Sequence, residues 1–146
     1  MTKLRPILLV EDNPEDAELT RLAFEQNNIA NPLILKRDGV EALEYLFGSS
    51  TTAREMTDLP QVVILDLKLP RVHGLEVLKQ IRAAETTRLL PVVVLTSSNQ
   101  DRDVIECYRL GVNAYVCKPV DFSAFSHALT QIGHFWLTIE HPADHQ

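Results

Sequence analysis

The chain has 146 residues, of which 45% are hydrophobic and 23% charged, a composition typical of one globular domain with a core large enough to fold alone. Its net charge of −6, without a basic block, argues against binding to nucleic acid or anionic membranes, and no apolar segment approaches the roughly 20 residues that span a bilayer. The N-terminus MTKLRP lacks the apolar core of a secretion signal, so we expect a cytoplasmic protein. Cys107 and Cys117 lack CxxC spacing, and we expect both thiols to be reduced and packed.

Five short apolar segments are predicted to be the strands of a parallel sheet. Three of them, rich in Val, Ile and Leu, do not alternate apolar with polar residues, which is typical of strands covered on both faces. Two weaker segments complete the set. In chain order the segments are PILLVED (6–12), LILKR (33–37), QVVILDL (61–67), PVVVLTSS (91–98) and AYVCK (114–118).

A helix is predicted after each strand. The first begins at Pro14, because Asn13 is a favourable N-cap, proline suits the first helical position, and Glu15 and Asp16 follow in the first turn. Gly111 is placed to end the fourth helix. The later helices are GVEALEYLF (39–47), GLEVLKQIRAAE (74–85), NQDRDVIECYRLG (99–111) and DFSAFSHALTQIGHFWL (121–137). This alternation predicts a (βα)₅ doubly wound sheet with right-handed crossovers, and the polar segment 49–60 is predicted to be a surface loop.

Acidic residues follow two of the strands at the edge where a doubly wound sheet binds ligands. Glu11 and Asp12 end the first strand, and Asp66 ends the third. Crowded carboxylates raise one another's pKa unless a cation neutralises them, and Mg²⁺ prefers oxygen ligands of this kind. We therefore expect Mg²⁺ at this edge, which Mn²⁺ or Ca²⁺ could replace.

The other side chains predicted at this edge suit a phosphoryl group. Asp66 can act as a nucleophile and become an aspartyl phosphate. The ammonium of Lys118 can neutralise charge on the transferring oxygens, and Thr96 can donate its hydroxyl to one of them. A single acid at such a position is more often only a residue near a helix N-terminus. Five suitable residues at matching strand ends favour a functional site instead.

These motifs together make the chain similar to a response-regulator receiver domain of two-component signalling, from about residue 6 to residue 132. The resemblance implies a flavodoxin-like sheet with strand order 2-1-3-4-5. It implies that Glu11 and Asp12 support Mg²⁺, and that Asp66 in DLKLPRVHG accepts a phosphoryl group from a histidine kinase. It also implies that the main-chain carbonyl of Lys68 completes the metal shell.

The resemblance further assigns residues of the fourth and fifth strands. Thr96 in VLTSS and Lys118 in the KP dipeptide correspond to phosphoryl-binding residues of the family, and Tyr115 corresponds to its switch aromatic. It implies that Thr96 moves toward the phosphoryl group and Tyr115 turns inward, which remodels the surface around the fourth and fifth helices.

Three features differ from most receivers. His73 stands where the family often has Asp before a glycine, and we expect it to be an exposed turn residue. Lys68 and Ser98 occupy positions that tune the phosphoryl lifetime, so this lifetime is left open. The acid pair and the phospho-acceptor are 54 positions apart, longer than usual, with the excess in the 49–60 loop. This insertion and the HFWL extension resemble small stand-alone regulators that serve cyanobacterial phytochrome kinases, so a phytochrome-like kinase is the expected partner.

The domain organisation predicts signalling by contact. Residues 1–132 are expected to form the receiver, and residues 133–146 only extend its last helix, which is too little for an output domain. Phe135 and Leu137 lie off the apolar stripe of this helix, and an exposed apolar patch favours a partner surface. We expect a homodimer through Phe135, Trp136 and Leu137. The alternative is that the extension packs against its own sheet.

Three other functions are weighed against this interpretation. Aspartate-nucleophile phosphatases usually carry a second acid two residues after the nucleophile, where this chain has Lys68, and a cap domain for which the chain is too short. A flavin or nucleotide module needs a loop that donates N–H groups to phosphate, whereas EDNPED would repel it. A receiver-like scaffold that no longer accepts phosphate is disfavoured by the intact site. We therefore expect no enzyme beyond self-directed phosphotransfer and autodephosphorylation.

Overall fold

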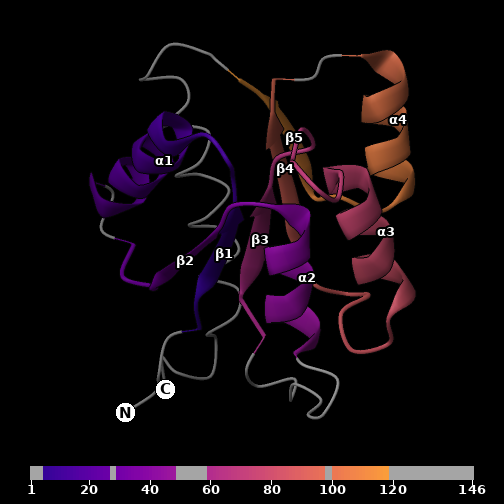
Figure 1. Ribbon diagram of the computed structural model, residues 1–146, viewed down its shortest axis with the longest axis horizontal. Helices are drawn as coiled ribbons and strands as arrows, with labels where there is room; N and C mark the ends of the chain where they lie inside the picture. Colours follow the sequence, from indigo (N-terminus) through magenta and orange to yellow (C-terminus); the bar gives the residue numbers. More distant parts are fainter. Residues whose placement is uncertain (1–4, 27–28, 49–58, 98–99, 119–146) are drawn as a thin grey trace, which may run out of the picture.

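A five-stranded parallel sheet with helices on both faces forms the described part of the protein, residues 5–26, 29–48, 59–97 and 100–118 of a computed structural model (Figure 1). The strand order is β2-β1-β3-β4-β5, which confirms the predicted flavodoxin-like order. The elements are β1 (Ile7–Val10), α1 (Pro14–Gln26), β2 (Leu33–Lys36), α2 (Gly39–Phe47), β3 (Val62–Leu65), α3 (Gly74–Ala83), β4 (Val92–Thr96), α4 (Asp101–Arg109) and β5 (Ala114–Cys117). The predicted fifth helix and the dimer residues Phe135, Trp136 and Leu137 lie outside the described residues.

The central strands alternate their side chains between two apolar clusters, one on each face of the sheet. Leu8 and Val10 of β1 join the larger cluster, and Ile7 and Leu9 join the smaller one. Every residue of β1, β3 and β4 is buried, because helices cover both faces. The continuous apolar segments were therefore correctly interpreted as interior strands.

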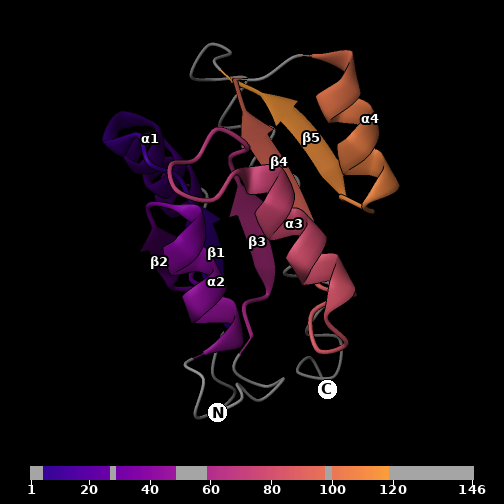
Figure 2. The same cartoon turned by 45° about the vertical axis from the view of Figure 1, so that its right-hand side comes forward.

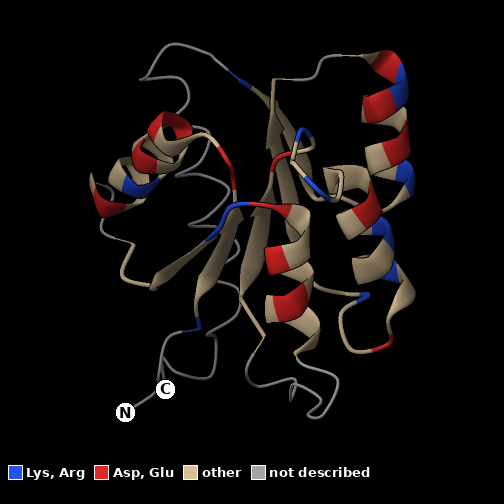
Figure 3. Cartoon of the chain, viewed as in Figure 1, with Lys and Arg blue, Asp and Glu red and all other residues tan. Residues whose placement is uncertain are grey.

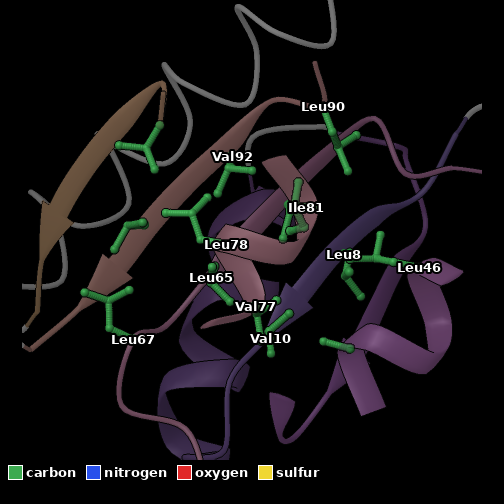
Figure 4. Packing of buried hydrophobic residues seen from close by; sticks show 14 of the residues in the cluster. Leu8, Val10, Leu46, Leu65, Leu67, Val77, Leu78, Ile81, Leu90 and Val92 are labelled. Atoms are coloured by element: carbon green, nitrogen blue, oxygen red, sulfur yellow. The ribbon is translucent and has the colours of Figure 1, made fainter. Parts of the chain in front are cut away.

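Helices α2, α3 and α4 cover one face of the sheet, and α1 lies on the other (Figures 1 and 2). In the larger cluster, Leu46 of α2 and Leu78 and Ile81 of α3 pack with Leu8 and Leu65 of the strands (Figure 4). Each is at most 1% exposed, and full burial of such a side chain stabilises a fold by about 1.5–3 kcal/mol. This packing fixes the strand ends, and therefore the residues that follow them.

Side chains and backbone conformation mark the helix ends largely as predicted. The side chain of Asn13 accepts hydrogen bonds from the N–H groups of Glu15 (2.8 Å) and Asp16 (3.2 Å), which confirms the cap of α1. Gly111 follows the C-cap of α4 and has a φ of 73°, a conformation that favours glycine.

Helix α3 ends two residues before the predicted boundary at residue 85. The hydroxyl of Thr87 donates to the carbonyl of Ile81 at 2.6 Å, and a longer helix would use this carbonyl to accept from the N–H of residue 85. The Thr87 side chain thus replaces a main-chain hydrogen bond of α3, and Ala84 adopts an extended conformation.

The prediction of a surface loop at residues 49–60 was wrong for the last two residues of the segment. Leu59 is only 4% exposed and Pro60 is also buried. The guanidinium of Arg5 donates to both of their carbonyls, at 3.1 and 2.9 Å, so a residue distant in sequence holds this end of the loop against the domain. The preceding residues, 49–58, lie outside the described part of the chain.

The two cysteines differ in their surroundings. Neither forms a disulfide, but only Cys107 is packed in the core, whereas Cys117 is exposed, so the prediction of two packed thiols was wrong for Cys117. Cys117 ends β5, which is the last strand of the sheet among the described residues. Within the described ranges, no helix combines the length and the apolar character that a membrane span requires.

Candidate functional site

The candidate site lies where the parallel strands end at one edge of the sheet. In Figure 3, acidic residues follow β1 and β3 at this edge, and a basic residue follows β5. Val10 pairs with Leu65, so the next residues, Glu11 and Asp66, are brought side by side. On the other side, the N–H of Lys118 donates to the carbonyl of Thr96 at 2.7 Å. Register between strands therefore assembles residues that are far apart in the sequence.

The three predicted metal ligands do come together. Carboxylate oxygens of Glu11, Asp12 and Asp66 all lie within 4.8 Å of one another. Glu11 is 2% and Asp66 5% exposed, whereas Asp12 faces solvent. Two buried carboxylates and one open to water form the hard oxygen donor set that Mg²⁺ prefers, because this ion retains several water ligands. The residues present thus fit a divalent cation.

Lys118 is the cation of the site. Its Nζ donates to Glu11 Oε1 at 2.6 Å, to Asp16 Oδ2 at 2.8 Å and to Asp66 Oδ2 at 3.1 Å. The side chain of Lys118 is only 6% exposed. Burial acts to lower the pKa of Lys118, but the hydrogen bonds to Asp16 and Glu11 and the charge of Asp66 outweigh it and raise this pKa above its usual range. The ammonium therefore stays charged.

Glu11 is the carboxyl group most affected by the crowding. Burial raises the pKa of Glu11 to about 7, the hydrogen bond from Lys118 opposes this increase, and the charge of Asp66 adds to it. The N–H of Asn13 donates to Glu11 Oε2 at 3.2 Å and orients the carboxylate. Near neutral pH a proton therefore competes with any cation that this group binds.

The loop after β3 orients the carboxylate of Asp66. The N–H of Lys68 donates to Asp66 Oδ1 at 3.0 Å, while Oδ2 faces the Lys118 ammonium. Gly74 packs directly against this loop: a Cβ there would lie 2.3 Å from the carbonyl oxygen of Asp66 and 2.5 Å from Cα of Leu67. Only glycine permits this close approach of α3 to the loop.

The predicted switch residues lie on strands β4 and β5. Thr96 is fully buried at the end of β4. Tyr115 pairs with Val94 and is half-buried against the larger core cluster. The motions expected of Thr96 and Tyr115 stay predictions.

Asp16 is a site residue that the sequence analysis missed. It was interpreted only as an acid in the first turn of α1, yet it contacts Lys118, which lies 102 residues later in the chain. No local pattern indicates this contact, because it depends on how the end of β5 sits relative to α1. His73 is exposed, as expected, and it also caps α3, since its Nδ1 accepts from the N–H of Leu75 at 3.2 Å.

The fold and the site define a class of protein. A doubly wound sheet of order 2-1-3-4-5, with three acids and a lysine gathered at the strand ends, is the architecture of a receiver domain. Residues 7–130 match the response regulator receiver domain family, and the chain therefore belongs to this family.

Two curated relatives match over most of their length. The probable methanogenesis regulatory protein FilR2 of Methanothrix harundinacea is 43% identical over 131 residues, which are 90% of this chain and 83% of that protein. The response regulator Rcp1 of Synechocystis sp. is 37% identical over 138 residues, which are 94% of this chain and 92% of that protein.

Solved structures of phytochrome response regulators are also similar. The phosphorylated cyanobacterial phytochrome response regulator RcpA has a TM-score of 0.80 and 34% identity, covering 94% of this chain and 96% of that one. The bacteriophytochrome response regulator RtBRR has a TM-score of 0.74 and 51% identity, covering 90% and 79%. The Mn²⁺-bound form of Rcp1 has a TM-score of 0.78 and 35% identity, covering 91% and 94%. The predicted resemblance to phytochrome response regulators is thus confirmed.

Proposed function

We propose that Asp66 is the phospho-acceptor of a response regulator that a histidine kinase phosphorylates. The observation that carries this proposal is the position of its carboxylate: it lies within 4.8 Å of the Glu11 and Asp12 oxygens and 3.1 Å from Lys118 Nζ. A nucleophilic carboxylate beside an ammonium and a cation-binding acid pair suits attack on a phosphoryl group. The phosphorylated form of the relative RcpA supports the same chemistry.

The proposed step is a transfer of one phosphoryl group between two side chains. An oxygen of the ionised Asp66 attacks phosphorus, and the bond from phosphorus to the imidazole nitrogen of the kinase breaks, so that the electron pair returns to the ring. Lys118 neutralises charge on the phosphoryl oxygens, and Thr96 donates its hydroxyl to one of them. The N–H of Lys68, 3.0 Å from Asp66 Oδ1, keeps the carboxylate oriented during the attack.

We propose Mg²⁺ as the physiological cation of this site. The carboxylates of Glu11, Asp12 and Asp66 and the main-chain carbonyl of Lys68 would hold it. When bound, it supplies electrostatic stabilisation of the charge that develops on the phosphoryl oxygens. The Mn²⁺-bound form of Rcp1 supports a divalent ion in this family, and Mn²⁺ or Ca²⁺ could substitute.

The proposed kinase partner is of the phytochrome type. Rcp1, RcpA and RtBRR support this assignment, because the latter two are phytochrome response regulators and all three match nearly the full length of this chain. FilR2 is a probable methanogenesis regulatory protein, so relatives of similar identity differ in the process that they regulate. Binding to an isolated phytochrome-type kinase therefore tests this part of the proposal separately.

The proposed output is a change in protein–protein contacts in the cytoplasm. Residues 1–132 would act as the receiver and residues 133–146 as an extension, and Phe135, Trp136 and Leu137 would join two copies in a homodimer. Thr96 and Tyr115 would couple phosphorylation to this surface. Neither nucleic acid nor a membrane is a proposed partner, since the chain carries a net charge of −6.

Phosphotransfer from a phosphorylated histidine kinase tests the proposal. We expect label to reach the wild-type chain in the presence of Mg²⁺ and not to reach Asp66→Asn, which keeps the size of the side chain but loses the nucleophile. Equal labelling of both proteins would contradict the assignment of Asp66. Rapid turnover of phosphorylated metabolites would instead support the phosphatase alternative, and failure of a folded, Mg²⁺-binding wild type to accept label would support the scaffold.

A further inference from the structure

Lys118 has one partner that belongs to neither the candidate metal site nor the phospho-acceptor. Asp16 Oδ2 accepts from Lys118 Nζ at 2.8 Å, shorter than the 3.1 Å contact with Asp66. Asp16 is the third residue of α1, and Asn13 fixes its main-chain N–H. Its carboxylate lies outside the cluster of three acids that fits a cation. A rigid helix thus presents an additional acceptor to the ammonium.

The three N–H groups of the ammonium are all used within the described structure. One donates to Glu11, one to Asp16 and one to Asp66. In the proposed reaction, Glu11 and Asp66 both change their partners, because the first would ligate the cation and the second would carry the phosphoryl group. The contact between Asp16 and Lys118, in contrast, is not interrupted by any proposed step.

We infer that Asp16 is a positioning residue that keeps the Lys118 ammonium beside the phospho-acceptor while the other two carboxylates exchange partners. The inference rests on the proposed function of Asp66. An ammonium at the end of a four-carbon chain has many rotamers, and an oriented lysine needs a fixed acceptor to stay in one of them. With Asp16 in place, one N–H is anchored and another is free to turn from Asp66 toward a phosphoryl oxygen.

The alternative explanation of Asp16 is a local one. An acid in the first turn of a helix interacts favourably with the helix dipole whether or not a lysine is nearby. Glu15 shares this turn and this charge, but it is exposed, and in the described part of the chain its carboxylate forms no hydrogen bond or ion pair with Lys118 or any other side chain. Glu15→Ala is therefore a matched control that removes the same charge without removing the contact.

The position of the ammonium can be tested in the metal-free protein by NMR of lysine side chains. We expect a resolved Lys118 ammonium signal in the wild type, because three hydrogen bonds and burial slow the exchange of its protons with water. The signal should persist in Glu15→Ala and be lost in Asp16→Ala. A Lys118 signal that is equally strong in both variants would overturn the inference, whatever their activity.

The consequence for phosphorylation can be tested with acetyl phosphate and Mg²⁺. We expect Asp16→Ala to lower the maximal rate about tenfold, the effect of losing one charge-assisted hydrogen bond, and Glu15→Ala to change it by less than about twofold. Asp16→Asn keeps an oxygen acceptor without its charge, and its phosphorylation rate should lie between those of Asp16→Ala and the wild type. This variant also controls for a folding defect in Asp16→Ala. Equal rates for Asp16→Ala and Glu15→Ala would overturn the inference.

The two proposals fail in distinguishable ways. Phosphorylation of Asp66→Asn would contradict the proposed acceptor, and the NMR comparison of Asp16→Ala with Glu15→Ala would still decide whether Asp16 holds the ammonium. The positioning role alone would be contradicted if the wild type is phosphorylated normally and substitution of Asp16 changes neither the Lys118 NMR signal nor the phosphorylation rate.

Discussion

Substitution of Gly74 by alanine is predicted to damage the site through the backbone of the acceptor loop. The added Cβ would lie 2.3 Å from the carbonyl oxygen of Asp66 and 2.5 Å from Cα of Leu67. Both are main-chain atoms, so no side-chain rotation can relieve the contact. The loop that carries Asp66, the proposed phospho-acceptor, must therefore move away from α3.

The size of the effect follows from these distances. Ordinary van der Waals contact requires roughly 3.5 Å, so the loop must shift by about 1 Å. Overpacking of this kind costs about 1–3 kcal/mol, and alanine in a helix returns up to about 1 kcal/mol, so we expect a net loss of no more than about 2–3 kcal/mol. A displacement of about 1 Å at reacting groups can cost about 100-fold in rate. Gly74→Ala should therefore show a large decrease in the rate of phosphorylation but only a moderate decrease in the free energy of unfolding.

Gly111→Ala is the matched control for this prediction. Its φ of 73° makes alanine strained, at a cost of about 1 kcal/mol, but its Cβ would lie 3.4 Å from the Arg82 side chain and at the opposite edge of the sheet. Thermal unfolding and the initial rate of phosphorylation with acetyl phosphate and Mg²⁺ should be measured for both variants. If Gly74→Ala is phosphorylated as fast as Gly111→Ala at equal stability, the close packing of α3 does not position Asp66.

Two further predictions concern titration and reactivity. Since the pKa of Glu11 is raised to about 7, the folded state binds this proton more tightly than the unfolded state, and the stability of the metal-free protein should fall as pH rises from about 4.5 through 7. The affinity for Mg²⁺, measured by calorimetry, should rise over pH 6–8. An affinity that does not change with pH would exclude Glu11 as a ligand. Cys117 should react with a thiol reagent in the native protein, whereas Cys107 should react only after unfolding, because it is buried and burial raises its pKa to about 11. Equal reaction rates of the two thiols in the native protein would contradict the burial of Cys107.

The strands and the acids that end them could be predicted because both depend on short sequence segments. A continuous apolar segment indicates an interior strand, and the doubly wound rule places Glu11, Asp12 and Asp66 at one edge before any contact is known. The structure brings these three carboxylates together as expected. Their positions at the ends of the predicted strands were enough for this prediction, because parallel register aligns the ends of neighbouring strands.

The features that could not be predicted depend on side-chain contacts that residue propensities do not encode. Asp16 reads as an ordinary first-turn acid until the end of β5 places Lys118 beside it. Leu59 lies in a polar segment, and its carbonyl accepts a hydrogen bond from Arg5, which is 54 residues away in the sequence but precedes the neighbouring strand β1. Helix α3 ends early because the side chain of Thr87 occupies a carbonyl of the last turn. Local propensity carries no information about such partners.

The charge balance of the site explains why phosphorylation should act as a switch. The Lys118 ammonium pairs with the carboxylates of Glu11, Asp16 and Asp66, and Asp12 lies beside two of them, so an excess of three negative charges exists when all four are ionised. A divalent cation would cancel two of these three charges, and a phosphoryl group on Asp66 would add back about one negative charge together with new acceptor oxygens. Lys118 cannot serve all of these acceptors with three N–H groups, so it must exchange at least one partner. Phosphorylation therefore has to rearrange the hydrogen bonds at the end of β5, the strand that also carries Tyr115.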